Sequence, residues 1–112
     1  MKLATAFLVT AIATLTPFMN AKSETGDVEK GEQLLQTNCS RCHAIGKTGT
    51  STHPQAPPFR DVVTRYPAVN LAEALAEGIV TGHPDMPVFT FDPSEIEAIV
   101  AYLDSLAPPR AD

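Results

Sequence analysis

The only two cysteines of the chain lie one helical turn apart in Cys39-Ser40-Arg41-Cys42, and His43 follows directly. Two thiols at this spacing can each add across one of the two vinyl groups of a haem, and the imidazole of the next residue can then bind the iron. The cysteines fix the cofactor covalently, and the histidine supplies one axial ligand. Cys39, Cys42 and His43 are therefore predicted to hold one covalent haem c.

Three other uses of the cysteine pair compete with haem attachment. An exported protein could hold a structural disulfide, because export favours oxidation. A thioredoxin-like redox pair requires a βαβ pattern, which the sequence lacks. A zinc site needs four ligands, and His53 and His83 lack the paired short spacing of zinc modules. Because the context for these uses is missing, haem attachment is the favoured interpretation.

The second axial ligand must come from another part of the mature chain. Met1 and Met19 lie in a predicted signal peptide, which leaves Met86 as the only thioether. Two prolines close to Met86 prevent a helix there and favour an extended loop that presents one side chain inward. A methionine opposite a histidine raises the reduction potential, because soft sulfur favours reduced iron. Met86 is the predicted ligand, and His53 and His83 are its rivals.

The first part of the chain has the layout of a secretory signal peptide. Lys2 gives a positive start, an apolar run covers residues 4–15, and a small residue precedes the expected cut. The run is shorter than the roughly 20 residues of a membrane-spanning helix, and Pro17 interrupts its end. We expect a cleaved signal over residues 1–21, export to the periplasm without a transmembrane anchor, and one haem domain over residues 22–112.

The mature protein is expected to be acidic. The full chain has 8 basic and 13 acidic residues, a net charge of −5. Cleavage removes Lys2, which leaves 7 basic residues against 13 acidic ones and a net charge of −6. The lysines and arginines are scattered, so the sequence lacks the basic stripe that nucleic-acid binding requires. An acidic surface suits redox partner proteins with a basic docking face.

Apolar residues recur at helical spacing through most of the chain, which predicts an all-α fold of three to five short helices. The expected helices cover residues 27–39, 59–66, 70–82 and 92–106. The second of them has one apolar face, made by Phe59, Val62, Val63 and Tyr66. Asn70 with Glu73 predicts a capping box at the start of the third helix. Asp92 predicts the N-cap of the last helix, with Pro93 at its first position.

Two long irregular stretches separate the expected helices, over residues 44–58 and 82–90. Loops of this length in so small a domain usually wrap a ligand. A mature chain of about ninety residues is only modestly stabilised by its own apolar core. A large buried cofactor therefore fits the size of this domain.

The order of these features resembles the class I monohaem cytochromes c, in particular small bacterial ones, over residues 27–106. The matching parts are the first helix with Gly31, the haem-attachment motif, the Pro57-Pro58-Phe59 loop, the Met86-Pro87 loop and a last helix with Tyr102. The resemblance implies a cytochrome c fold whose N- and C-terminal helices cross, with Gly31 against Tyr102. It also implies that the Pro57 carbonyl accepts a hydrogen bond from the His43 ring and orients the imidazole.

The expected function is outer-sphere electron transfer by a monomer that is not itself an enzyme. A second candidate is a haem subunit that relays electrons inside a periplasmic dehydrogenase complex. A third is a ligand-binding haem protein with an open sixth position on the iron. The chain departs from the mitochondrial type in having no tryptophan and no lysine-rich face, so other groups must hold the haem propionates. Arg65 and Tyr66 are the candidates for that role.

Overall fold

The computed structural model describes residues 24–78 and 85–109, in which every regular element is a helix and none is a strand. The elements are α1 (Glu24–Asn38), α2 (Phe59–Arg65), a 3₁₀ turn η1 (Ala68–Leu71), α3 (Ala72–Glu77) and α4 (Pro93–Leu106). The predicted all-α fold is confirmed. The predicted signal peptide, residues 1–21, lies outside the described residues. Within the two described ranges, no helix has both the length and the apolar character needed to cross a membrane.

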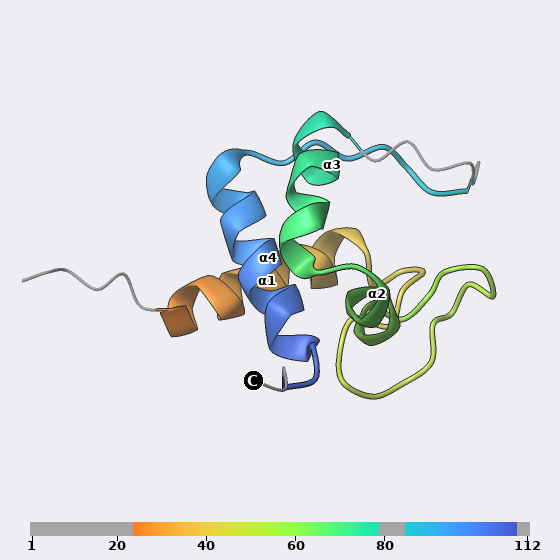
Figure 1. The fold of residues 1–112 in the computed structure, drawn as a ribbon. Coiled ribbons are helices and arrows are strands. Elements are labelled where there is room, and N and C mark those ends of the chain that lie inside the picture. The colour runs from red at the N-terminus through yellow and green to blue at the C-terminus, as the bar shows by residue number, and fades with distance from the viewer. Residues whose placement is uncertain (1–23, 79–84, 110–112) are drawn as a thin grey trace, which may run out of the picture.

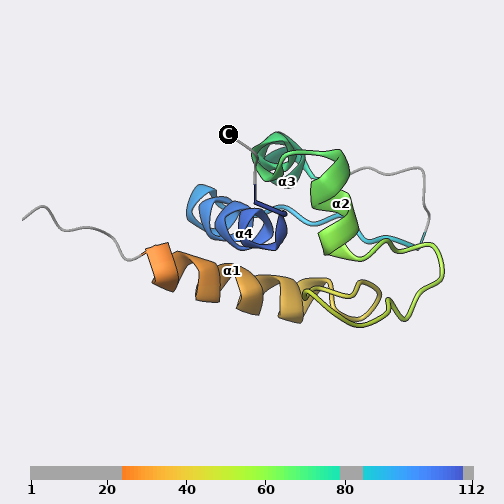
Figure 2. The ribbon, with the colours of Figure 1, turned by 60° about the horizontal axis from the view of Figure 1, so that its bottom comes forward.

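Helix α4 lies between α1 on one side and α3 on the other (Figures 1 and 2). Leu35 of α1 and Ile99 of α4 are the largest side chains that are fully buried. The crossing of α1 and α4 is close at Gly31, where an added Cβ atom would overlap the Ala98 carbonyl oxygen and lie 2.8 Å from Cβ of Tyr102. The crossing of the two terminal helices, with Gly31 against Tyr102, is therefore confirmed.

The apolar core joins every helix to α4. Its buried members are Leu35, Val63, Ala68, Leu75, Phe91, Ile96, Ile99, Tyr102 and Leu103. Tyr102 also donates a hydrogen bond from its hydroxyl to the Ile45 carbonyl oxygen, at 2.9 Å. Burial, and then the charge of Glu32, raise the pKa of Tyr102, so the hydroxyl remains a protonated donor at neutral pH. This bond ties α4 to the loop that follows the cysteine motif.

Helix α4 begins as predicted, at an Asp92 N-cap followed by Pro93. The Asp92 carboxylate accepts hydrogen bonds from the backbone N–H groups of Ser94, at 2.8 Å, and Glu95, at 3.0 Å. The Glu95 carboxylate in turn accepts the Asp92 N–H at 3.0 Å, which completes a capping box. The Glu95 amide and then the Ser94 hydroxyl lower the pKa of Asp92, so this cap is ionised at neutral pH.

The predicted start and end of the third helix are wrong. The chain is already helical from Ala68, in η1, so Asn70 lies inside a turn and makes no side-chain cap. Helix α3 ends at Glu77 because Gly78 takes a φ of +91°, a backbone conformation that glycine adopts without strain. Gly82, at the predicted end, lies outside the described residues.

Helix α2 agrees with its prediction except at its last residue. Val63 is buried, whereas Tyr66 is 57 % exposed and does not belong to the apolar face. Tyr66 has extended φ and ψ angles of −131° and 125°. Pro67 follows it, and a residue before proline is driven out of the helical conformation, so the Tyr66 side chain leaves the helix face.

Candidate haem-binding site

The cysteine motif continues the last turn of α1. The backbone N–H of Cys39 donates to the Leu35 carbonyl at 2.8 Å, and those of Cys42 and His43 donate to the Cys39 carbonyl at 3.1 and 2.9 Å. These bonds keep the chain coiled through the motif, so both cysteines and the histidine project from neighbouring turns. Because Leu35 is buried against α4, the position of the motif is set by the core.

A cavity of about 290 Å³ lies beside the motif. In both ribbon views, the loop between α1 and α2 and the segment leading into α4 extend from the same side of the helical core (Figures 1 and 2). The cavity is lined by Thr37, Asn38, Cys39, Arg41, Cys42, His43, His53, Gln55, Ala56, Asp85, Met86, Pro87 and Phe89. Residues that are far apart in the sequence, from the end of α1 and from both loops, therefore line the same cavity.

The His43 ring is held from two directions. Its Nδ1 atom lies 2.7 Å from the carbonyl oxygen of Pro57, the contact that the resemblance implies. The Phe59 ring stacks on it, with ring centroids 4.7 Å apart and planes inclined by 19°. Because a carbonyl only accepts, Nδ1 carries the proton and donates it, which leaves the Nε2 lone pair available to a metal.

The two cysteines are half-buried and free. Burial, and then the neighbouring Cys42, raise the pKa of the Cys39 thiol to about 11. At neutral pH Cys39 is therefore an uncharged thiol, the form that suits a largely apolar surrounding. The structure thus places two half-buried thiols at the cavity, on consecutive turns.

Met86 reaches the cavity from the other loop. It is half-buried and lies just before the paired aromatic rings of Phe89 and Phe91, whose centroids are 6.1 Å apart. Phe91 is buried, and its backbone N–H donates to the Leu75 carbonyl at 3.2 Å. This anchor to α3 fixes the C-terminal side of the loop and keeps Met86 at the cavity wall.

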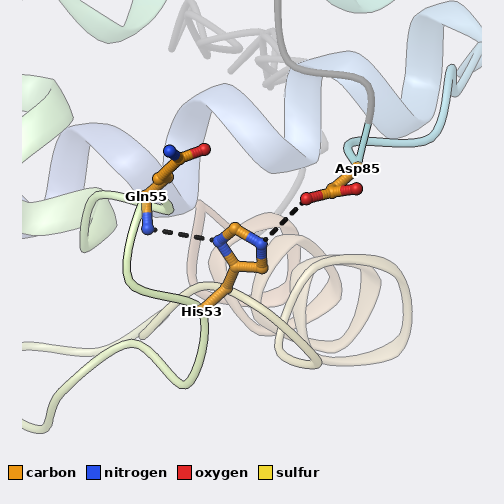
Figure 3. A network of polar contacts seen from close by, with 3 residues as sticks. All are labelled: His53, Gln55 and Asp85. Carbon is orange, nitrogen blue, oxygen red and sulfur yellow. Dashed lines mark hydrogen bonds and ion pairs between the residues drawn. The ribbon is translucent and has the colours of Figure 1, made fainter.

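His53, an alternative to Met86 as the predicted second axial ligand, also lines the cavity, but both of its ring nitrogens have hydrogen-bond partners (Figure 3). Nδ1 accepts the backbone N–H of Gln55 at 3.2 Å, and Nε2 lies 3.3 Å from a carboxylate oxygen of Asp85. His83, the other rival, lies outside the described residues. Sequence reasoning missed Asp85, and its only signal is its place next to Met86.

The two residues considered for the haem propionates do not line the cavity. Arg65 closes α2, and Tyr66 follows it in an exposed position. Arg41, inside the cysteine motif, is a cationic residue that does line the cavity. Neither candidate for propionate binding is therefore among the residues that line the cavity.

The donor groups around the cavity fit a covalent haem. Haem c attachment and axial ligation require two thiols, an imidazole and a thioether. The cavity offers two thiols one helical turn apart, an imidazole whose Nε2 lone pair is available, and a thioether on another wall. Most of the other lining is contributed by carbon, including Ala56, Pro87 and Phe89. An apolar lining with a few placed polar groups is typical of cofactor sites.

Comparisons with known proteins identify the family of the chain. The family model for cytochrome c matches residues 28–107, from α1 to the residue after α4. A cytochrome c6 from Bryopsis maxima is 33 % identical over 81 residues, which cover 70 % of this chain and 90 % of that protein. No solved structure gives a significant match. The chain therefore belongs to the cytochrome c family, and it is an electron carrier with one covalently bound haem c rather than an enzyme.

Proposed function

We propose that this protein carries single electrons in the periplasm, with haem c attached to Cys39 and Cys42 and its iron bound by His43 and Met86. The observation that carries the proposal is the shared cavity, which gathers these four side chains from two segments of the chain. When bound there, haem supplies a couple of ferric and ferrous iron that stores one electron. The residues of the protein bind the haem, orient it and shield it from water.

Each of these side chains has a separate task. Cys39 and Cys42 each contribute one thioether bond, which prevents loss of the cofactor. His43 donates its Nδ1 proton to the Pro57 carbonyl, so the imidazole keeps one orientation and is a stronger donor through Nε2. Met86 contributes a soft sulfur, which favours the reduced iron and raises the reduction potential.

Two filled axial positions favour electron transfer over ligand binding. With His43 on one side and Met86 on the other, an incoming small molecule has no coordination site unless Met86 leaves. The half-buried positions of both side chains, and the bonds that hold His43, favour a site that changes little between redox states. Small rearrangement is what rapid outer-sphere transfer needs, and it supports an electron carrier.

Export and acidic charge indicate the setting and the partners. The apolar run at residues 4–15 supports a cleaved signal peptide and release into the periplasm. The mature chain would then have 7 basic and 13 acidic residues, a net charge of −6. Opposite charge raises the rate of encounter, so redox partners with a basic docking face are favoured.

The attachment of haem is tested by replacing the cysteines with serine. The wild-type protein is expected to keep its haem after extraction with acidified acetone, because thioether bonds survive this treatment. Cys39→Ser and Cys42→Ser should each keep one bond, whereas the double variant should release all of its haem. Intact mass before and after extraction measures the result. Thr48→Ser, in the loop between α1 and α2, is the matched control and should keep its haem as the wild type does. Haem retained by the double variant after extraction would contradict the proposal.

A further inference from the structure

His53 connects the two walls of the cavity. Its backbone N–H donates to the Cys42 carbonyl at 3.2 Å, within the attachment motif. Its side chain points to the opposite wall, where Nε2 lies 3.3 Å from the carboxylate of Asp85 (Figure 3). Asp85 directly precedes Met86 in the chain. One residue therefore links the segment that carries the cysteines to the loop that carries the methionine.

The hydrogen bonds of the His53 ring define where its proton lies. The backbone N–H of Gln55 can only donate, and its acceptor is Nδ1 of His53, at 3.2 Å. Nδ1 is therefore unprotonated, and the proton of the neutral ring is on Nε2. Nε2–H then donates to Asp85, whose carboxylate oxygens accept. The hydrogen bond from Gln55 therefore orients the ring so that Nε2–H faces Asp85.

The residues next to Met86 contribute little apolar burial to the loop. Asp85, Pro87 and Val88 are all exposed, with Val88 at 64 %. The aromatic anchor at Phe91 acts only on the C-terminal side. The hydrogen bond from His53 to Asp85 adds a restraint at the residue that directly precedes Met86.

We propose that His53 is a positioning residue for Met86, which it holds at the cavity by donating a hydrogen bond to Asp85. The proposal rests on the proposed function, in which Met86 is an axial ligand of the haem iron. His53 does not bind the iron in this arrangement, because both ring nitrogens are already engaged. Its effect on the site passes through Asp85 to the neighbouring residue.

Binding of an external ligand to the ferric protein measures this restraint. The ligand can bind only when Met86 has left, so its apparent affinity includes the free energy of releasing the loop. The Asp85 side chain is 72 % exposed and that of His53 is 31 % exposed, so water weakens their interaction. Losing it is expected to raise the apparent affinity by roughly two- to fivefold, the range for an exposed pair.

The experiment is an imidazole titration of the ferric holoprotein at about pH 8, where imidazole is mostly neutral and insensitive to the charge of Asp85. His53→Ala and Asp85→Ala should each raise the affinity about two- to fivefold, and the double variant should add nothing further. His53→Gln should stay close to wild type, because its amide can place a donor near the position of Nε2. The exposed carboxylate of Asp61, on α2, provides the matched control in Asp61→Ala, which should have no effect.

Unchanged imidazole affinity in both single variants would overturn the inference. So would a His53→Ala effect that persists in the Asp85→Ala background, because His53 would then not act through Asp85. If His53→Ala fails to load haem, Asp85→Ala and His53→Gln still decide the question. A wild-type protein without the far-red absorption band of methionine-bound ferric iron would remove Met86 as ligand, whereas a wild type with the band and unaffected variants would overturn this inference alone.

Discussion

Replacing Met86 with alanine is expected to abolish the weak far-red absorption band of sulfur-bound ferric iron. The reduction potential should fall by on the order of 100 mV or more, because water or a nitrogen ligand favours ferric iron relative to a thioether. Covalent haem should be retained, since Cys39 and Cys42 are unchanged. Optical spectra of the ferric protein and a redox titration measure the two effects.

Val88→Ala is the matched control for this substitution. Val88 lies in the same loop, and its side chain is 64 % exposed. Its truncation tests whether any change in the loop disturbs the band, and we expect a wild-type spectrum and potential. A Met86→Ala protein that keeps the band would show that another side chain supplies the sixth ligand.

Gly31→Ala is expected to lower the free energy of unfolding by about 2–3 kcal/mol. The new Cβ would overlap the Ala98 carbonyl oxygen, and it would lie 2.6 Å from the Ala98 carbonyl carbon and 2.8 Å from Cβ of Tyr102. None of these atoms can rotate away, so α1 and α4 would have to separate. The better helix propensity of alanine, about 1 kcal/mol, offsets only part of this cost. Guanidinium unfolding of the ferric protein measures the change.

Gly46→Ala is the control for the glycine substitution. Gly46 lies in the loop after the motif, has no heavy atom within 4 Å of an added Cβ and has no positive φ. The same chemical change there should alter the unfolding free energy by less than about 0.5 kcal/mol. Equal stability of the two variants would contradict the tight crossing of α1 and α4.

Features that depend on neighbouring residues were predictable from the sequence. The N-cap at Asp92 was predicted because the side chain caps an amide only two or three positions away. The coiled cysteine motif was also predictable, since its backbone bonds span a single turn. The crossing at Gly31 needed the family resemblance, because a glycine alone does not identify the helix that approaches it.

Features that depend on the tertiary fold were not predictable in the same way. The capping box at Asn70 failed because the chain enters α3 through η1, a turn that packs Ala68 into the core. The helical spacing of Tyr66 predicts a place on the apolar face of α2. Pro67, the next residue, instead gives Tyr66 an extended backbone conformation. The pairing of His53 with Asp85 depends on two loops meeting across a cavity, and no local pattern records that contact.

An optical spectrum of the purified mature protein, first oxidised, then reduced, then exposed to carbon monoxide, tests whether the chain carries a covalent haem with Met86 as the sixth ligand of its iron. We predict sharp bands in the reduced protein, a weak far-red band in the ferric protein and no rapid change with carbon monoxide. Rapid binding of carbon monoxide would contradict Met86 as a filled sixth position. A colourless protein would contradict haem attachment itself and would favour a disulfide between Cys39 and Cys42.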